Sequence, residues 1–502
     1  MNKFRSTDRR QLMLLPTCVE DFVSETHISR FIEKIVNELD TSNIEKKYSY
    51  FGRKGYHPKD LLKILFYGYS IGDRSSRKLA DRCKSDVAYM FLSGMQEPDF
   101  RTISDFRKNN LEQLKEYFKK IVTLCFNLKM FSGGGIFIDG TKIRGNASAK
   151  RTKDMEELDK ALKGAEEKIR HALEEAEKID KEEDSIYGEE QGNELPKDLR
   201  NNKVLIERIR EAMKELQQTD AKKINLTDSD AVYMKERSGV IKPAFNCQLA
   251  VTESQVIVAM DVVKEPNDTG QLKPMINNVR ETAPKFKFDK VAADSGYGVI
   301  NNIKYLIDEN IDGYVVPMNS ELKKVRGDKT GQYRFHRYNF ICDIEKDVYC
   351  CPNNQELKFK KFRKFRGHDI KVYRCGACKD CKDKKLCTNA HYRELAINQE
   401  EKLMLDMQEK LASENGKKEY KKRMYSVEPV FGDIKHNRGC RQFLLRSLKK
   451  VRGEFALMCT VHNIRKIYQY LSSESDKLKK FLETIGKYCL KNENFALFKC
   501  TK

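Results

Sequence analysis

The feature that most constrains the fold is a heptad repeat that lies between two strand-like segments. Between Met155 and Ile179, apolar residues recur at alternating steps of three and four, and Glu and Lys fill most other positions. After the linker DSIYGEEQGNELP the repeat resumes with Leu199, Ile206, Ile209, Met213 and Leu216. Such a seam predicts two helices that pack as a coiled coil. We therefore expect an antiparallel helical hairpin over residues 151–222, inserted into another domain.

The segments around this hairpin predict an α/β layer. GGGIFIDG reads as a strand followed by a turn at Asp139-Gly140, and AFNCQLAVTESQVIVAMDVV reads as a β-hairpin. Helix-like and strand-like segments then alternate, and KFDKVAADSGYG predicts a strand that ends at Asp294. The order strand, inserted hairpin, two strands, helix, strand, helix, strand predicts a mixed sheet flanked by helices.

The N-terminal 130 residues predict helices. Pro58 suits a first helical position, Ser75 or Ser76 suits an N-cap, and a third helix is expected from Thr102 to Leu128. Its many Lys and Arg residues favour DNA binding or dimerisation, with a plain helical bundle as the alternative. The predicted division is 1–130 helical domain; 131–150, 223–320 and 396–470 α/β core; 151–222 hairpin; 321–395 cysteine-rich insertion; and 471–502 helical C-terminal tail.

The charge of the chain points to a polyanionic partner. Lys and Arg number 96 against 75 Asp and Glu, which gives a net charge of +21 and a pI near 9.2. An excess of this size favours nucleic acid over other partners. The basic start carries only a short apolar run, and no stretch of about 18 apolar residues is present, so we expect no secretory signal, no membrane span and a cytoplasmic location.

The cysteines are clustered in a way that favours a metal. Seven of the fifteen lie between Cys342 and Cys387, and a cytoplasmic location disfavours disulfides. Spacings of the Cys-x-x-Cys type suit tetrahedral Zn²⁺. The candidates for the four ligand positions are Cys350, Cys351, Cys375, Cys378, Cys381 and Cys387. Reduced cysteines without metal are the alternative.

Three acids are candidates for the chemistry. Asp139 and Asp294 follow predicted strands, where sites form in α/β sheets, and Glu428 lies in a later helix-compatible stretch. An Asp before Gly is usually turn chemistry, and a salt bridge is the simple account of Glu428. Three converging carboxylates would repel by about 4 kcal/mol per pair at 4 Å and a dielectric near 20, and a divalent ion removes that repulsion.

A basic frame surrounds Glu428 and predicts a phosphate-binding surface. Its members are Lys421, Lys422, Arg423, Lys435, Arg438 and Arg441. A second basic strip holds 12 Lys or Arg and 3 Asp between Lys358 and Lys385, including Lys360, Lys361 and Arg363, and it is interleaved with Phe359, Phe362, Phe365 and Tyr373. Basic and aromatic residues together favour DNA contact with stacking on unpaired bases. The alternative is a solvated ribbon whose phenylalanines pack on the insertion.

The segments GIFIDGTKI, ADSGY and SVEPVFGDIKHNRG resemble the DDE transposases of bacterial insertion sequences, and residues 57–107 resemble the helical domain that precedes the core in one branch of them. The resemblance implies an RNase H-like core in which Asp139, Asp294 and Glu428 bind Mg²⁺ or Mn²⁺. It also implies roles for Tyr420, Arg423 and Lys435 in a Tyr-Arg-Glu-Lys signature. Here four residues, rather than three, separate Arg423 from Glu428. Asn246 and Tyr297 also match residues common in the family, and core packing explains them equally well.

The resemblance further favours Cys351, Cys378, Cys381 and Cys387 as the zinc ligands. It implies cleavage at the terminal inverted repeats of the element and attack of the resulting 3′-hydroxyl on target DNA by two-metal-ion phosphoryl transfer. We expect double-stranded DNA as partner, a homodimer and association with the bacterial nucleoid. The open alternatives are an RNase H-like nuclease without strand transfer and a catalytically inactive, zinc-stabilised DNA-binding protein.

Overall fold

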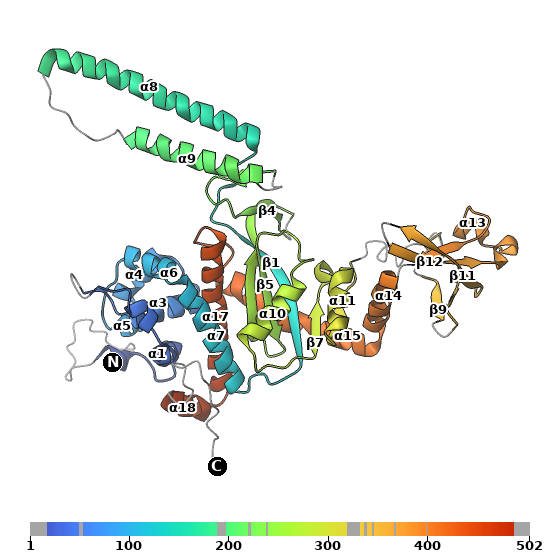
Figure 1. The fold of residues 1–502 in the computed structure, drawn as a ribbon. Helices are drawn as coiled ribbons and strands as arrows, with labels where there is room; N and C mark the ends of the chain where they lie inside the picture. Colours follow the sequence, from blue (N-terminus) through green and yellow to red (C-terminus); the bar gives the residue numbers. More distant parts are fainter. Residues whose placement is uncertain are drawn as a thin grey trace, which may run out of the picture.

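The computed structural model describes residues 18–49, 54–187, 197–218, 222–236, 239–318, 332–335, 339–343, 346–365, 368–397 and 399–485. The predicted tail beyond residue 485 lies outside this part of the chain. The architecture is a mixed α/β one, with helices at the N-terminus and a mixed sheet at the centre (Figure 1). No helix among the described residues is long and apolar enough to cross a membrane.

The N-terminal segment is helical, as its sequence predicts. A 3-10 turn, Val19–Phe22, precedes the helices α1 Ile28–Glu38, α2 Ser42–Glu45, α3 Pro58–Ile71, α4 Ser76–Ser85, α5 Val87–Ser93, α6 Phe100–Asn109 and α7 Leu111–Asn127. Pro58 occupies the first turn of α3, and Ser75 is the N-cap residue of α4.

Two predicted helices are each divided in the structure. The helix expected after Ser75 ends at Ser85, because the Asp86 side chain accepts a hydrogen bond from the Ala88 backbone N–H and starts α5. The helix expected from Thr102 to Leu128 is interrupted at Asn110, whose side-chain amide donates to the Phe106 carbonyl. Asp and Asn compete for backbone hydrogen bonds in this way, so both breaks follow from local chemistry.

The central sheet has the strand order β4-β5-β1-β7-β8, and β6 also pairs with β5. β5 pairs antiparallel with β1, β4 and β6, whereas β7 runs parallel to β1 and to β8. The strands are β1 Gly135–Arg144, β4 Val232–Lys235, β5 Ile241–Thr252, β6 Ile257–Val263, β7 Lys290–Ala293 and β8 Asp312–Val315, and the helices between them are α10 Leu272–Thr282 and α11 Ile300–Asp308.

The expectation of a turn at Asp139-Gly140 was wrong. β1 continues to Arg144 because the long strand β5 pairs with it from Ile136 to Arg144. The parallel pairing with β7, by contrast, ends at Ile138. Asp139 is therefore inside β1 but just beyond the end of its parallel partner.

Helices α8 Met155–Tyr187 and α9 Lys197–Gln218 pack on each other and extend away from the sheet (Figure 1). A separate hydrophobic cluster joins them, with Leu158 of α8 against Ile209, Ala212 and Leu216 of α9. The short strands β2 Thr152–Lys153 and β3 Ile224–Asn225 pair at the base, after a 3-10 turn at Ala149–Arg151. The chain thus leaves and re-enters the sheet region at one place.

The cysteine-rich segment forms its own small sheet of order β13-β12-β11-β10-β9. Its strands are β9 Ile341–Asp343, β10 Val348–Cys350, β11 Glu356–Phe365, β12 His368–Cys375 and β13 Glu394–Ile397, with short helical turns at Gln332–Phe335, Ala377–Asp380 and Lys384–Cys387 (α13). A second hydrophobic cluster, which includes Tyr349, Leu357, Tyr373 and Leu395, holds this sheet together.

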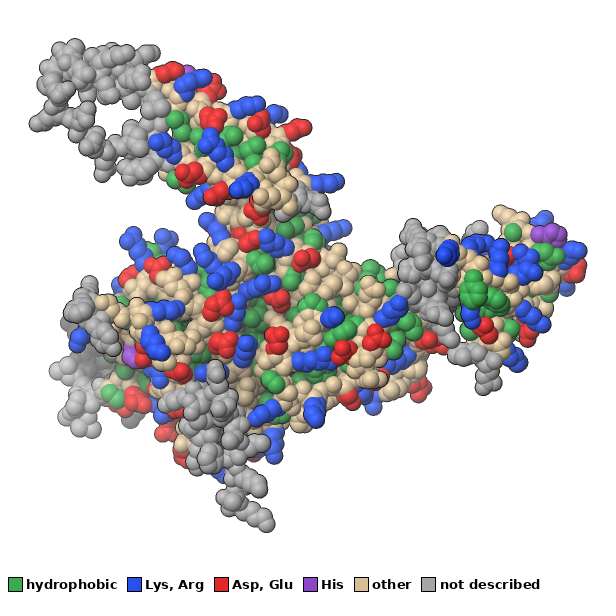
Figure 2. Space-filling view, in the orientation of Figure 1, with side chains coloured by type: hydrophobic (Ala, Val, Ile, Leu, Met, Phe, Trp, Pro, Cys, Tyr) green, Lys and Arg blue, Asp and Glu red, His purple; other side chains and the backbone are tan. Residues whose placement is uncertain are grey.

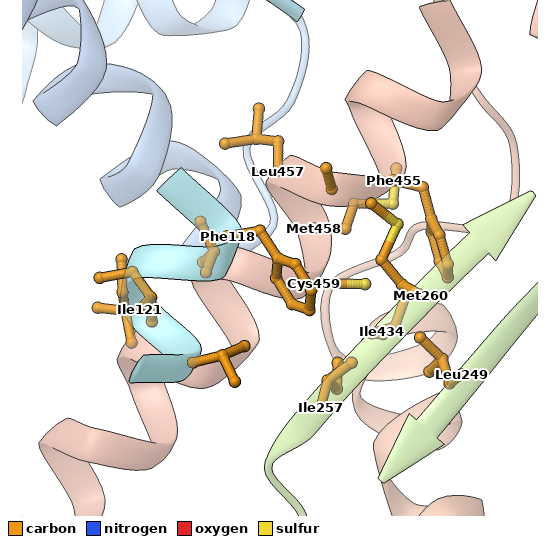
Figure 3. Packing of buried hydrophobic residues seen from close by; sticks show 14 of the residues in the cluster. Phe118, Ile121, Leu249, Ile257, Met260, Ile434, Phe455, Leu457, Met458 and Cys459 are labelled. Carbon is orange, nitrogen blue, oxygen red and sulfur yellow. The ribbon is translucent and has the colours of Figure 1, made fainter. Parts of the chain in front are cut away.

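The C-terminal helices return to the centre of the molecule. They are α14 Gln399–Ala412, α15 Glu414–Lys421, α16 Arg423–Gly432, a π-helical turn Asp433–Asn437, α17 Leu448–Ser472 and α18 Ser475–Thr484. The buried helix α17 packs between α7 and β6, so Phe118, Phe455, Met458 and Ile257 lie in one cluster (Figure 3). The N-terminal helices and the sheet therefore share a continuous hydrophobic core.

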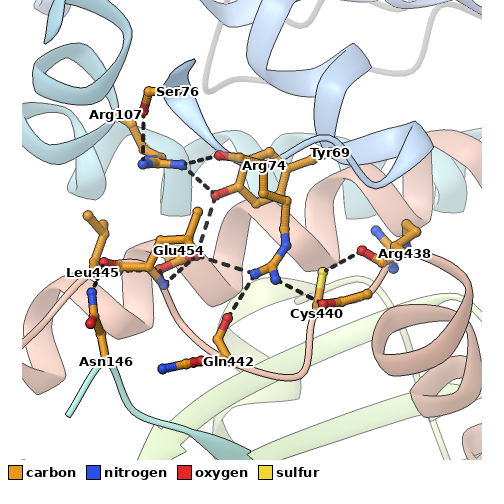
Figure 4. A network of polar contacts seen from close by, with 12 residues as sticks. Tyr69, Arg74, Ser76, Arg107, Asn146, Arg438, Cys440, Gln442, Leu445 and Glu454 are labelled. Atoms are coloured by element: carbon orange, nitrogen blue, oxygen red, sulfur yellow. Dashed lines mark hydrogen bonds and ion pairs between the residues drawn. The ribbon is translucent and has the colours of Figure 1, made fainter. Parts of the chain in front are cut away.

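A buried polar network fixes the loop that follows the π-helical turn (Figure 4). Glu454 of α17 is fully buried, and its carboxylate accepts hydrogen bonds from the backbone N–H groups of Leu444 and Leu445, each 2.9 Å away. Arg74 donates to the carbonyls of Gly439 and Gln442 from the other side. The loop is thereby held against the end of β1, where Arg144 forms a bridge with Gln442.

Candidate active site

The sheet register brings two of the three predicted acids together. Ile138 of β1 pairs with Ala293 of β7 in parallel, so the next residues, Asp139 and Asp294, lie side by side. Neighbouring strands are about 4.8 Å apart, and residues in register point to the same face of a parallel pair. Two carboxylates are thus placed where the parallel pairing of β1 and β7 ends, although only 4% of Asp139 is exposed.

Asp139 is in contact with a cation from α16. Its Oδ1 accepts a hydrogen bond from the Gly140 backbone N–H at 2.9 Å, and its Oδ2 lies 3.3 Å from Nη2 of Arg423. Burial, the largest single effect, lowers the pKa of the Arg423 guanidinium, but Asp139, Tyr420 and Asp294 together raise that pKa overall. Arg423 is therefore charged and offsets the buried charge of Asp139.

Tyr420 and Arg423 form a pair despite the altered spacing in the signature. Nη1 of Arg423 donates to the Tyr420 hydroxyl at 3.0 Å, and the guanidinium lies over the tyrosine ring. Because Arg423 is buried and faces Asp139, its predicted direct contact with DNA is not supported by this structure. Its position instead links α16 to the carboxylate of β1.

Asp294 is held by the turn that follows β7. Its Oδ1 accepts a hydrogen bond from the Gly296 backbone N–H at 2.8 Å, which caps the turn Ser295–Tyr297. Tyr297 is buried, and its hydroxyl donates to Oε1 of Gln248. Burial, followed by the charges of Asp268, Asp139 and Asp294, raises the pKa of Tyr297 well above its usual value. Tyr297 thus stays protonated and serves as a donor.

Asp268 is a carboxylate of this region that our sequence reasoning missed. Its Oδ1 accepts hydrogen bonds from Asn246 and Gln248 at 2.6 and 2.7 Å, and its Oδ2 lies 3.9 Å from Nζ of Lys142. The position of Asp268 in the sequence could have identified it, because it lies in the loop after β6 and sites form in loops beyond strand ends. From the sequence alone, the stretch Asn-Asp-Thr-Gly reads as the start of a helix-like segment.

Glu428 is not brought to the two aspartates. The face of α16 toward the sheet is formed by Ser426, Val427 and Val430, whereas Glu428 is exposed. Within the described ranges, no three His, Cys, Asp or Glu side chains are grouped so that they could hold a metal ion. The predicted triad is therefore present as an adjacent pair plus a solvent-facing glutamate on the neighbouring helix.

Lys435 lies seven residues beyond Glu428, in the turn that continues α16. Its ammonium group donates to Oγ1 of Thr141 and to the carbonyl of Lys142, both at 2.9 Å. Lys435 belongs to the π-helical turn Asp433–Asn437, a distortion that often marks functional sites. Since Arg423 and Lys435 both reach β1, Glu428 is located between two anchored points of the helix.

The prediction that Arg438 binds DNA was wrong. Only 2% of Arg438 is exposed, its Nε lies 3.0 Å from Oδ2 of Asp433, and its Nη1 donates to the Met458 carbonyl. A side chain enclosed in this way cannot reach a phosphate. Arg441, three residues later, is exposed, and its guanidinium lies beside the Lys435 carbonyl and the His436 ring.

The cysteine-rich sheet contains a cavity lined by sulfur. Its walls include all four favoured ligands and one competitor, namely Cys351, Cys375, Cys378, Cys381 and Cys387. Three of these sulfurs accept N–H groups, from Gln355 to Cys351, from Arg393 to Cys378 and from Asn353 to Cys381. Burial raises the pKa of Cys375 to about 11. Cys342 and Cys350 are not among the residues that line the cavity. Cys375 does line it, so Cys375 is still an alternative to one of the four favoured ligands.

The basic strip is an exposed hairpin of strands β11 and β12. Lys360, Lys361 and Arg363 are exposed on β11, and Figure 2 shows Lys and Arg side chains gathered on this unit. Phe359 and Phe362 are 43% and 61% exposed, with their ring centroids 5.1 Å apart. This strip therefore presents aromatic faces and positive charge to the solvent together.

Two family models match the chain. One, described as a transposase DDE domain, matches residues 350–468, and the other, described as a transposase domain (DUF772), matches residues 17–109. No curated protein and no solved structure matches it. The first match covers Glu428, Lys435 and strands β11 to β13 of the cysteine-rich sheet, and the second covers helices α1 to α6. Two separate regions of the chain thus match transposase families, which supports a DDE transposase of the kind that insertion sequences encode and implies DNA binding.

Proposed function

We propose that this transposase cleaves DNA at the ends of its element and joins them to target DNA by metal-dependent phosphoryl transfer at Asp139, Asp294 and Glu428. The observation that carries the proposal is that Asp139 and Asp294 directly follow Ile138 and Ala293, the last paired residues of the adjacent parallel strands β1 and β7. The strand directions, antiparallel from β6 through β5 to β1 and parallel from β1 through β7 to β8, support an RNase H-like core.

The residues present fit a hard divalent cation. Carboxylate oxygens are the ligands that Mg²⁺ and Mn²⁺ prefer, and a bound ion would share with Arg423 the oxygen of Asp139 that lies 3.3 Å from its guanidinium. Asp139, Asp294 and Glu428 would hold the ions, with Glu428 turning inward from its exposed position on α16. Bound Mg²⁺ would activate the attacking water or 3′-hydroxyl and stabilise the leaving oxygen.

The side chains around these acids would position the DNA. Arg423 offsets the charge of Asp139, and Tyr420 orients Arg423. Lys435, anchored on β1, and the exposed Arg441 would bind the phosphates next to the scissile bond. Lys360, Lys361 and Arg363, together with Phe359 and Phe362, would bind the backbone and stack on unpaired bases farther away.

Two further parts of the chain have proposed roles. Cys351, Cys378, Cys381 and Cys387 line one cavity, and the surrounding N–H groups can support thiolates. As these side chains now lie they are not grouped to hold an ion, so they would have to draw together around a structural Zn²⁺. The α8–α9 hairpin would join two copies of the chain, since joining two ends requires two active sites. The domain division of the sequence analysis is retained as part of this proposal.

Strand transfer separates a transposase reaction from simple nuclease action. A labelled, pre-cut element end with a free 3′-hydroxyl would be mixed with plasmid, Mg²⁺ and the protein, and covalent label on the plasmid would be measured. The proposal expects joining by the wild type and none by Glu428→Gln. The control Glu474→Gln, at an exposed glutamate between α17 and α18, should join normally. Cleavage of intact ends without any joining would favour the nuclease instead.

A further inference from the structure

Four polar side chains near Asp139 and Asp294 are connected by hydrogen bonds. They are Asn246, Gln248, Asp268 and Tyr297. Asn246 and Gln248 lie on β5, are fully buried, and each donates a hydrogen bond to Oδ1 of Asp268, at 2.6 and 2.7 Å. Gln248 also accepts the hydroxyl hydrogen of Tyr297. Both ends of the Gln248 amide are therefore used, which fixes its orientation.

This chain touches the backbone beside both catalytic candidates. Gly140 follows Asp139 and faces Gln248 across the β1–β5 pair. A Cβ on Gly140 would lie 2.6 Å from Oδ1 of Asp268, and a Cβ on Gly296 would lie 3.2 Å from its Oδ2. Real Cβ atoms essentially never show a contact as short as the one at Gly140, and the contact at Gly296 is tighter than most. Glycines at both positions thus leave the space that Asp268 fills.

The arrangement relates the position of Asp268 to that of Asp294. Asp294 caps the turn Ser295–Tyr297 by accepting a hydrogen bond from the Gly296 backbone N–H, and Tyr297 is the last residue of that turn. Asp268 orients Gln248, Gln248 holds Tyr297, and Tyr297 fixes this turn. Hydrogen bonds to an ionised acceptor are shorter and stronger than neutral ones, so a carboxylate at the centre makes the chain stiff.

We propose that Asp268 is a positioning residue of the active site: through Asn246, Gln248 and Tyr297 it fixes the spacing between Asp139 and Asp294 and so sets their affinity for a divalent cation. The inference rests on the proposed function, because it presumes that these two aspartates hold the ion. It also gives Asn246 and Tyr297 a purpose beyond core packing.

The test measures metal affinity directly, without DNA or turnover. Mn²⁺ would be titrated into the full-length chain, and free Mn²⁺ would be followed by electron paramagnetic resonance at a temperature where circular dichroism shows each variant to be folded. Loss of residues that orient metal ligands typically weakens binding by 10–100-fold. Asp268→Ala should therefore bind Mn²⁺ about 10–100-fold more weakly than the wild type.

The conservative variant distinguishes positioning from direct ligation. Asp268→Asn keeps one oxygen that can accept from both amides, so it should restore most of the affinity lost in Asp268→Ala. Glu265→Ala, an exposed acid in the same loop, should bind as the wild type does. If Asp268→Ala fails to fold, Tyr297→Phe breaks the same chain by removing one oxygen, and it should also weaken Mn²⁺ binding.

Several results would overturn the inference. Wild-type affinity in Asp268→Ala or, if that variant does not fold, in Tyr297→Phe would show that the chain does not set metal binding. If Asp268→Asn and Asp268→Ala bind Mn²⁺ equally weakly, the charge of Asp268 acts directly on the ion rather than through the hydrogen-bonded side chains. Asp294→Asn serves as the reference: if it too binds as the wild type, the proposed function fails together with the inference, whereas loss in Asp294→Asn alone removes only the inference.

Discussion

Arg438 and Arg441 lie three residues apart in one basic run, yet the structure assigns them opposite roles. Arg438 is enclosed, and its Nε contacts Asp433 at 3.0 Å, whereas Arg441 is exposed. We therefore predict that Arg438→Met lowers stability and leaves DNA affinity per folded molecule unchanged. Methionine keeps much of the volume of the arginine stem, so loss of charge dominates the effect.

The expected loss can be worked out from the contacts of Asp433. Removing one partner of a buried ion pair costs about 3–5 kcal/mol, because the other charge is left uncompensated. Asp433 keeps His462 at 3.1 Å and Arg465 at 3.3 Å, so the lower end, about 3 kcal/mol, applies. At about 2–4 °C per kcal/mol, the unfolding temperature should fall by roughly 6–12 °C.

The matched variant is Arg441→Met. Thermal unfolding would be followed by circular dichroism, and DNA affinity would be measured at 20 °C over a range of salt concentrations. Arg441→Met should unfold at the wild-type temperature and reduce the slope of log affinity against log salt by about 1, as expected for one lost phosphate contact. Our reasoning is refuted if Arg438→Met keeps the wild-type unfolding temperature and reduces the salt slope instead.

Three further predictions concern other parts of the molecule. Burial raises the pKa of Asp433, but the hydrogen bond from His462 and the charges of Arg438 and Arg465 lower it more, so the pKa is depressed overall. The stabilisation of the fold by ionised Asp433 is complete above the unfolded pKa of about 3.9 and is lost as the pH falls below that value. Asp433→Asn should therefore be less stable than the wild type at pH 7 and should lose less stability between about pH 4 and 2. Equal acid-unfolding curves for the two proteins would contradict this prediction. Mass spectrometry of the metals should find about one zinc per chain, and Cys378→Ser should lose it while Cys342→Ser, outside the cavity, keeps it; retention by both would contradict the zinc assignment. Replacing residues 155–216 with a short linker should give a monomer by light scattering that binds DNA but does not join ends, and full joining activity would show that the hairpin is dispensable.

Most of the sheet could be predicted because its signals are local. The alternation and turn residues that mark β5, β6 and β7 lie in the strands themselves, and the heptads that mark α8 and α9 do not depend on their partners. The end of β1 could not be predicted, because its continuation past Asp139 depends on pairing with β5, more than a hundred residues later. An Asp-Gly pair is turn chemistry only when no partner strand extends beyond it.

The candidate site was predictable in the placement of two acids and not in their surroundings. The apolar runs that precede Asp139 and Asp294 were enough to assign both residues to strands of one sheet. Arg438 and Arg441 have the same chemistry in the sequence, and only the packing of the π-helical turn on α17 decides which of them is buried. Asp268 was missed because its role depends on two amides of β5 that no local pattern connects to it.

The measurement that tests the central claim most directly is Mg²⁺-dependent nicking of plasmid DNA that carries the ends of the element. The wild type would be compared with Asp139→Asn, Asp294→Asn and Glu428→Gln, with DNA binding measured in parallel. We predict that the wild type nicks only with a divalent cation and that each substitution abolishes nicking while DNA is still bound. Equal nicking by all four proteins would show that these acids do not carry the chemistry.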